Sequence, residues 1–132
     1  MSTPTIAGIV EAALYVDDVP RAVRFYETVL GFETIELDER LTAMSVGGRQ
    51  VLLVCKRGAS THIDVAHDAH GRQHVAFSVA ESDMEAWAAK LRENGVTIER
   101  DRRWERGGRS LYFRDPEGHI LELASPGVWT VY

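Results

Sequence analysis

Hydrophobic positions alternate with polar ones in short runs along the chain, and helical periods of apolar residues lie between these runs. The order is the same in both halves: an alternating run, a helical run, a glycine and three more extended segments. The first strands are residues 11–16 and 74–79. The pattern therefore predicts two copies of one βαβββ unit.

Both expected helices carry end signals. Asp17 or Asp18 is suited to cap the first helix, and Gly31 to end it. Ser82 and Glu85 have the spacing of a capping box at the start of the second helix. The other extended segments are residues 33–37, 41–46, 50–55, 97–100, 110–114 and 120–124.

We expect a single domain in which module 1 covers about residues 9–58, a linker about 59–71 and module 2 about 72–127. A chain of 132 residues with 45% hydrophobic residues buries enough surface to fold without a structural metal. Any bound metal is therefore expected to be functional.

Alternation along each strand sorts its side chains onto two faces. The fully apolar face of the first strand in each module is expected to pack on a helix, which leaves Glu11 and His74 on the opposite face. In the last strand, the same alternation turns Glu122 away from the helix, between Leu121 and Leu123. Glu11, His74 and Glu122 are thus predicted to share a cleft.

A divalent metal is the simplest partner for such a set. A buried unpaired carboxylate costs several kcal/mol, and two close carboxylates do not both stay ionised without a cation. An alternative source of imidazole is the linker, which contains His62, His67 and His70. A solvated linker is the competing interpretation of that segment.

Composition limits the partners. The net charge of −5 argues against nucleic acid and anionic membranes as main partners, and the arginines of residues 100–109 are interrupted by acidic residues and glycines. Cys55 is the single cysteine, and the N-terminus has no basic segment followed by an apolar run. These features predict a cytoplasmic protein with a small-molecule substrate.

Three motifs together resemble the vicinal oxygen chelate superfamily, which includes glyoxalase I, extradiol dioxygenases, methylmalonyl-CoA epimerase, fosfomycin-resistance enzymes and bleomycin-resistance proteins. The resemblance runs from about Val10 to Pro126. The motifs are ALYVDDVPRAVRFYETVLGF at 13–32, HVAFSV at 74–79 and YFRDPEGHILEL at 112–123. The resemblance implies an α+β fold of two βαβββ modules, related by pseudo-twofold symmetry, that form a half-barrel cleft around a metal.

In this family, ligands come from the first and last strands of the modules. His74 and Glu122 fall on two such positions, and Glu11 falls where many members have histidine. Aligning Gly48 with Gly118 places Leu52 at the position of Glu122, where glyoxalase I carries a fourth, carboxylate ligand. Leucine does not coordinate, so the expected metal ligands are Glu11, His74 and Glu122.

The resemblance and this ligand set predict a glyoxalase-like enzyme in which one dication, Mn, Mg, Fe, Zn or Ni, acts as a Lewis acid on a small substrate with vicinal oxygens. Lyase, isomerase and epimerase chemistry all fit. Two alternatives stay open: a metal-free binding protein of the bleomycin-resistance type, and an extradiol-type dioxygenase. One His and two carboxylates differ from the two His and one carboxylate of the dioxygenase centre.

Further residues have expected roles in proton transfer, substrate binding and dimer formation. Glu11 or Tyr15 is the candidate base. Trp104, Arg109 and Tyr112, in a segment with a Gly107-Gly108 hinge, are the candidate substrate-binding residues. Family members commonly pair, so a homodimer is expected, and the C-terminal residues Trp129 and Tyr132 are candidates to join the interface or to cover the cleft.

Overall fold

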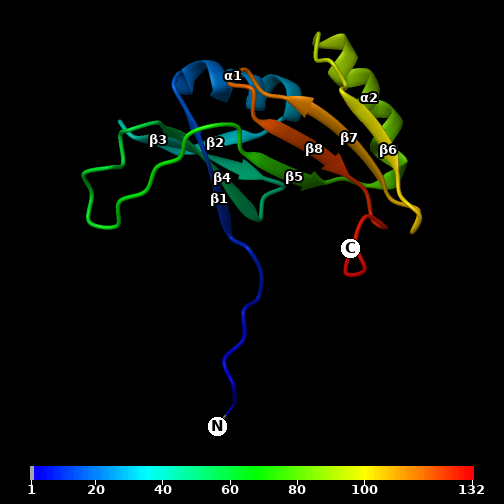
Figure 1. Cartoon of the computed structure of the whole chain (residues 1–132), viewed down its shortest axis with the longest axis horizontal. Coiled ribbons are helices and arrows are strands. Elements are labelled where there is room, and N and C mark those ends of the chain that lie inside the picture. Colours follow the sequence, from blue (N-terminus) through cyan, green and yellow to red (C-terminus); the bar gives the residue numbers. More distant parts are fainter. Residues whose placement is uncertain (1) are drawn as a thin grey trace. The chain divides into compact units, whose positions relative to one another are not determined.

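The computed structural model describes residues 2–132, which divide into two compact units, one ending at His70 and one beginning at Gly71. Each unit contains a four-stranded mixed sheet and helical segments in the order βαβββ (Figure 1). The α+β class and the repeated order predicted from the sequence are confirmed. No helix in residues 2–132 combines the length and the apolar character needed to cross a membrane.

The first unit has its strands in the order β1-β4-β3-β2, with β1 parallel to β4 and the other neighbours antiparallel. Its elements are β1 (Glu11–Val16), α1 (Val19–Leu30), β2 (Glu33–Leu37), β3 (Leu41–Val46) and β4 (Gln50–Lys56). Asp18 caps α1 by accepting a hydrogen bond from the Arg21 amide, and Gly31 ends it in the left-handed conformation at φ 74°. Both predicted ends of this helix are confirmed.

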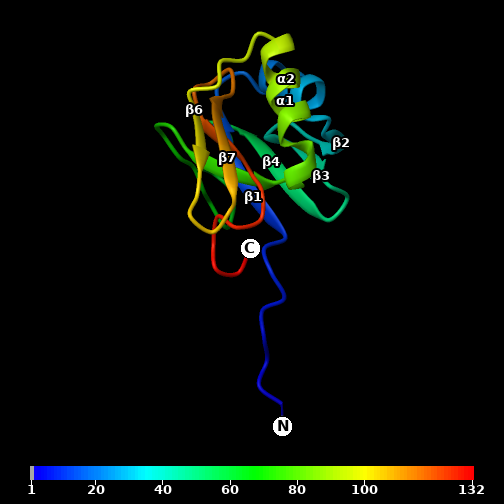
Figure 2. The same cartoon turned by 90° about the vertical axis from the view of Figure 1, so that its right-hand side faces the viewer.

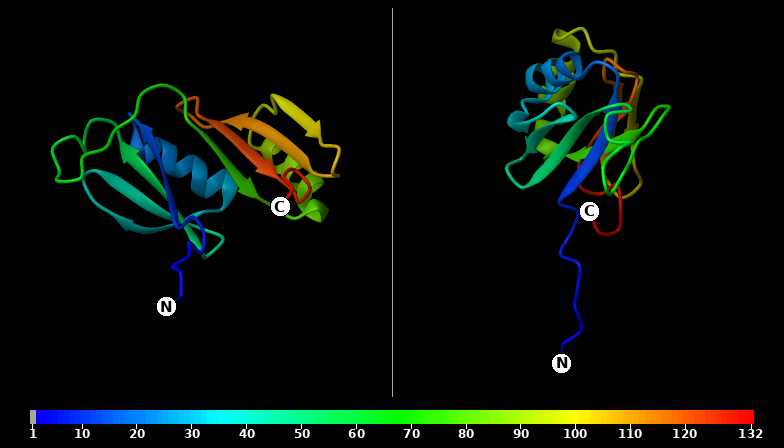
Figure 3. Two further views of the ribbon diagram at one scale, coloured as in Figure 1. Left: turned by 60° about the horizontal axis from the view of Figure 1, so that its bottom comes forward. Right: turned by 90° about the vertical axis from the view of Figure 1, so that its left-hand side faces the viewer.

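The second unit repeats the arrangement, with strand order β5-β8-β7-β6. Its elements are β5 (His74–Ser78), a 3₁₀ turn η1 (Glu81–Asp83), α2 (Met84–Glu93), β6 (Arg100–Arg103), β7 (Arg109–Arg114) and β8 (Ile120–Ala124). Figure 2, which views α2 and β6 from their side of the molecule, and the left view of Figure 3 show α2 along one face of this sheet. The core lies between them, where Met84, Ala88 and Leu91 are buried with Leu111 and Leu123.

Two local predictions for this unit are wrong. The expected capping box is absent: Asp83 is the N-cap of α2 and makes no side-chain cap hydrogen bond, while Glu85 pairs with Arg109. The strand expected at residues 97–100 lies at Arg100–Arg103, because a tight hairpin closes beyond it through the hydrogen bond from the Trp104 amide to the Gly108 carbonyl.

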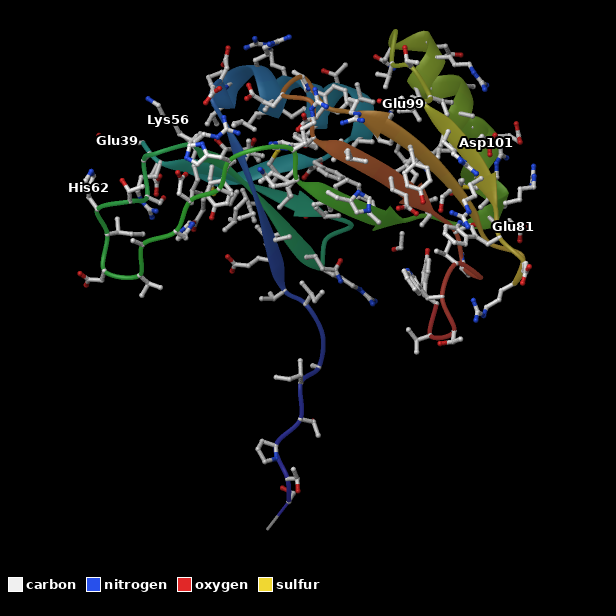
Figure 4. All side chains as sticks on the ribbon, in the orientation of Figure 1. Glu39, Lys56, His62, Glu81, Glu99 and Asp101 are labelled. Atoms are coloured by element: carbon white, nitrogen blue, oxygen red, sulfur yellow. The ribbon has the colours of Figure 1, made fainter. Side chains whose placement is uncertain are left out.

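The segment after β4, expected to be a solvated linker, is tied to the first unit. The Arg57 guanidinium donates to the Asp17 carboxylate at 2.6 Å, to the Tyr15 carbonyl at 2.9 Å and to the Ala69 carbonyl at 3.1 Å. The Gly58 amide donates to the Asp68 carboxylate at 3.0 Å. These contacts fix both ends of the loop, whereas His62 lies in its exposed middle part (Figure 4).

Candidate functional site

A pocket of about 430 Å³ lies on the sheet of the second unit, on the face opposite α2. It is lined by His74, Ala76 and Ser78 of β5 and by Glu122 and Ala124 of β8. These residues alternate with side chains that pack toward the helix, such as Leu121 and Leu123, which are 0% and 1% exposed. Strand alternation therefore places His74 and Glu122 on one surface, as the sequence predicted.

His74 and Glu122 face each other across this surface. The His74 Nε2 atom lies 3.4 Å from the Glu122 Oε1 atom, and the side chains are 49% and 8% exposed. The other imidazole nitrogen, Nδ1, lies 2.9 Å from the Ile120 carbonyl oxygen. Because a carbonyl only accepts, Nδ1 carries a proton, so whatever lies on Nε2, a second proton or a metal ion, is directed at the carboxylate. This pair is therefore complete only with a cation, either a proton or a metal ion, beside both atoms.

The Glu122 carboxylate is held by a relay of two hydrogen bonds. The Trp104 indole Nε1–H donates to the Ser110 hydroxyl at 2.9 Å, and that hydroxyl donates to Glu122 Oε2 at 2.6 Å. An indole is only a donor, so it fixes the direction of the Ser110 hydroxyl. Ser110 is 0% exposed. The relay thus engages one carboxylate oxygen and leaves the other turned toward His74.

Tyr112 completes the polar end of the pocket. It stands opposite Glu122 in the β7–β8 register and lines the same cavity. Burial raises the pKa of its phenol, and the negative charge of Glu122 adds to this effect. The phenol of Tyr112 therefore stays protonated at neutral pH.

The donor atoms of this unit suit a divalent metal. Two ligand atoms about 2.1 Å from one tetrahedral ion lie about 3.4 Å apart, which matches the separation of His74 Nε2 and Glu122 Oε1. The Nδ1–carbonyl bond and the Ser110–carboxylate bond are the kind of outer contacts that orient metal ligands. Within residues 2–132, however, no group of three or more His, Cys, Asp or Glu side chains is gathered as a metal site. The second unit brings together two candidate ligands, His74 and Glu122.

Glu11 and Tyr15 belong to β1 in the first unit. Glu11 is exposed at the start of the strand, and its place in the metal centre stays a prediction. The Tyr15 hydroxyl hydrogen-bonds His67 Nδ1, and burial, followed by the nearby Cys55 and Asp68, raises the pKa of the phenol. A raised pKa makes the phenolate scarce at neutral pH, so these contacts argue against Tyr15 as a base.

The linker histidines also lie in the first unit. His67 is engaged by Tyr15, His70 lies 3.3 Å from the Asp68 carboxylate, and His62 is exposed. The His70–Asp68 pair has nearly the same nitrogen–oxygen distance as the His74–Glu122 pair, but its side chains are more exposed, at 80% and 20% against 49% and 8%. The use of a linker histidine as a metal ligand therefore stays an untested alternative.

Arg109 does not line the pocket, in contrast to its expected role in substrate binding. Its guanidinium donates to both Asp101 oxygens, at 2.9 and 2.7 Å, and to Glu85 of α2. The bonds to Asp101 raise the pKa of Arg109 and lower the pKa of Asp101. Figure 4 shows Asp101 on β6, the edge strand. Arg109 is three residues from Tyr112, so alternation puts its side chain on the helix side of β7.

Leu52 also lies on the helix side, because it is buried at 1% exposure in line with Val54. The pairing of Glu11 with Val51, compared with that of His74 with Ile120, makes Leu53 the counterpart of Glu122. The glycine alignment was wrong because the two hairpin turns differ in length, spanning residues 47–49 and 115–119. A leucine stands at the fourth ligand position in either register.

Sequence reasoning missed some of the residues that build the pocket. Strand alternation puts Ser110 on the same face as Tyr112, so the sequence could have predicted that Ser110 faces the pocket. Its hydrogen bond to Trp104 depends on the hairpin turn and was not predictable in this way. Val128 was not foreseen, whereas Trp129 and Tyr132, which the sequence offered as candidates to cover the cleft, line the cavity with it from the C-terminal segment. The Tyr132 hydroxyl donates to the Ala124 carbonyl at 2.7 Å, which holds that segment against the end of β8.

Curated relatives and solved structures agree on the family of this fold. The chain is 33% identical to "Metallothiol transferase FosB" of Shouchella clausii, over 89% of this chain and 80% of the relative. It is 29% identical to the protein of the same name from Bacillus licheniformis, over 98% of this chain and 82% of that one. The crystal structure of lactoylglutathione lyase from Agrobacterium tumefaciens superimposes with a TM-score of 0.88 at 29% identity, covering 96% of this chain and 99% of that chain.

The model of one protein family matches residues 8–123, which run from just before β1 to the last residue but one of β8. The resemblance predicted from the three sequence motifs is thereby confirmed. The chain belongs to the Glyoxalase/Bleomycin resistance protein/Dioxygenase superfamily.

Proposed function

We propose that this protein is a divalent-metal-dependent enzyme acting on a small organic substrate with two neighbouring oxygens. The observation that carries the proposal is the His74–Glu122 pair, in which the imidazole Nε2 and a carboxylate oxygen face each other at 3.4 Å. Glu11 is the proposed third ligand. The names of the FosB relatives, which include the word metallothiol, support a metal-dependent family branch.

A bound dication would supply Lewis acidity toward negative charge that develops on a substrate oxygen. The chain's own residues prepare the site for it. The Ile120 carbonyl accepts a hydrogen bond from His74 Nδ1, and the Ser110 hydroxyl orients the Glu122 carboxylate. The Tyr112 phenol, whose pKa is raised by burial, lines the same pocket as a protonated group.

Lyase, isomerase or epimerase chemistry is the leading proposal for the reaction. It needs a base near the reacting carbon, and Glu11 is the proposed group because the contacts of Tyr15 disfavour a phenolate. The structural neighbour named lactoylglutathione lyase supports this class. The identity of the metal among Mn, Mg, Fe, Zn and Ni is left to experiment.

Thiol transfer is a second candidate, favoured by 33% identity to a metallothiol transferase. The thiol would come from a second substrate, because Cys55, the single cysteine, is fully buried and burial raises its pKa to about 11. A dioxygenase centre of two His and one carboxylate is less favoured, since the second unit offers one imidazole beside Glu122. We propose a cytoplasmic homodimer as the working form.

Calorimetric metal titration of chelator-treated protein tests the proposal. We expect Glu122→Gln, which keeps the side-chain shape but removes the charge, to weaken binding of Zn²⁺ or Mn²⁺ by more than about 100-fold. Glu11→Gln is expected to weaken it as well, whereas His62→Ala, a change in the exposed loop, leaves it unaltered. Equal affinity in wild type and Glu122→Gln would contradict the proposal, and loss in His62→Ala would move the site to the linker.

Turnover then separates the two reaction classes. Metal-loaded protein is incubated with lactoylglutathione for lyase or isomerase chemistry, and with a small thiol and an epoxide for thiol transfer. Whichever reaction is catalysed is expected to stop when the metal is removed and to resume when it is restored. Turnover that is unchanged by chelation would rule out the metal-dependent mechanism.

A further inference from the structure

The pocket of the second unit has aromatic walls away from His74 and Glu122, formed by Trp104, Trp129 and Tyr132. We infer that the substrate carries a planar, uncharged aromatic group, which lies between these walls and directs its neighbouring oxygens toward His74 and Glu122. The direction of the oxygens rests on the proposed function. The aromatic binding stands on the wall residues alone.

Two of the three wall side chains have their polar atoms bonded within the protein. The Trp104 indole N–H donates to Ser110, and the Tyr132 hydroxyl donates to the Ala124 carbonyl. These side chains therefore offer carbon surfaces to the pocket, which suits stacking and edge contacts with a ring better than hydrogen bonding.

The two sides of the wall are held together by a backbone contact. A Cβ atom on Gly108 would lie 2.4 Å from the Val128 amide nitrogen, and one on Gly127 would lie 2.5 Å from the Gly108 nitrogen. The turn that follows Trp104 thus packs directly on the segment that carries Trp129. On the Trp104 ring, the Arg102 guanidinium lies 3.6 Å from the centroid and fixes the plane of the indole. The aromatic walls are therefore preorganised, which lowers the entropy lost on binding.

The charges of the lining residues further restrict the chemical class of the ligand. No Lys or Arg is among the described residues that line the pocket, and Glu122 is its acidic member. A carboxylate, sulfonate or phosphate on the aromatic group would meet no Lys or Arg among these lining residues, and in the metal-free protein it would be repelled by Glu122. The volume of about 430 Å³ lies within the range of small-molecule pockets. Trp129 is 68% exposed and gains contact area when a ring covers it.

The test uses ¹⁵N-labelled, chelator-treated full-length protein and follows the indole N–H signals of Trp87, Trp104 and Trp129 by NMR. The probe is naphthalene-2,3-diol, which is planar, neutral and has adjacent oxygens. We expect the Trp104 and Trp129 signals to shift on titration, while Trp87 on α2 does not. Cyclohexane-1,2-diol, which has the oxygens without the ring, and the sulfonated naphthalenediol are expected to bind at least about tenfold more weakly.

Variants locate the interaction. Trp129→Ala is expected to weaken binding of naphthalene-2,3-diol roughly tenfold, whereas Val131→Ala, a change at a 94% exposed position of the same segment, leaves it unchanged. The inference is overturned if no indole signal shifts up to the solubility limit, if Trp87 shifts equally, or if the cyclohexanediol binds as well as the naphthalenediol.

The same titration on metal-loaded protein separates the two proposals. Indole shifts in a protein that binds no metal would refute the proposed function and leave the aromatic pocket standing. Metal bound at His74 and Glu122 without any indole shift would refute the aromatic pocket and leave the proposed function standing.

Discussion

The Ser110 hydroxyl links the Glu122 carboxylate to Trp104 through two hydrogen bonds. The substitution Ser110→Ala tests how much the carboxylate depends on this link. The substitution removes the donor to Glu122 Oε2 and the acceptor of the Trp104 indole at once. Alanine fits the space of a fully buried serine, so the loss of hydrogen bonds dominates the outcome.

The expected cost follows from the two bonds. A hydrogen bond to a charged group contributes about 1.5–3 kcal/mol, and a neutral one about 0.5–1.5 kcal/mol. Glu122 is 8% exposed, so water does not fully replace the lost donor, whereas Trp104 is half-buried and is better able to find water. We therefore expect Ser110→Ala to lower the free energy of unfolding by about 3 kcal/mol and to weaken metal binding by about 10- to 100-fold.

Urea denaturation of Ser110→Ala, Glu122→Gln and the double variant measures the coupling between the two side chains. We expect a coupling free energy of about 1.5–3 kcal/mol. Ser78→Ala, an exposed change on the same face of the sheet, serves as a stability control and should cost less than about 0.5 kcal/mol. A coupling below about 0.5 kcal/mol, or a cost of Ser110→Ala equal to that of the control, would refute the relay.

Three further predictions concern other parts of the fold. Burial raises the pKa of the Cys55 thiol from 9.0 to about 11, so the stability of wild type relative to Cys55→Ala is constant below pH 9.0 and falls by about 1 kcal/mol per pH unit toward pH 11; a difference in unfolding free energy that does not change with pH would contradict this. Asp18→Ala should lower the free energy of unfolding by about 1 kcal/mol in urea denaturation because Asp18 caps α1, and Ser82→Ala should lower it by less than about 0.5 kcal/mol. A larger cost for Ser82→Ala than for Asp18→Ala would indicate that Ser82 caps α2 after all. Gly108→Ala forces a contact at 2.4 Å and should destabilise by about 2 kcal/mol while shifting the Trp129 indole signal, so an unchanged Tm and spectrum would argue against the backbone contact.

The sequence predicted what depends on strand period and helix ends. The apolar alternation around Val75 and Leu121 was strong enough to place His74 and Glu122 on one face, because the opposite face must cover a helix. Asp18 and Gly31 marked the ends of α1 for reasons of local hydrogen bonding and backbone conformation. These features are determined by residues close together in the chain.

The sequence predictions were wrong at positions that depend on the length of a turn or on contacts between distant elements. Arg109 was treated as part of a loop, although β7 begins there and alternation turns its side chain away from Tyr112. Leu52 was misplaced because glycines were aligned across turns of unequal length. Glu85 pairs with Arg109 of another element in place of the capping contact. The aromatic wall from the C-terminal segment depends on a contact between Gly108 and residues 127–128 that no local pattern encodes.

The metal content of untagged protein, purified and dialysed briefly against a weak chelator, tests the central claim most directly. Elemental analysis is carried out on wild type beside His74→Ala and Glu122→Ala, with circular dichroism to show that all three are folded. The account predicts about one dication per chain in wild type and none in either variant. Folded wild-type protein that holds no metal, and takes up none when Mn²⁺, Fe²⁺, Zn²⁺ or Ni²⁺ is supplied, would contradict it.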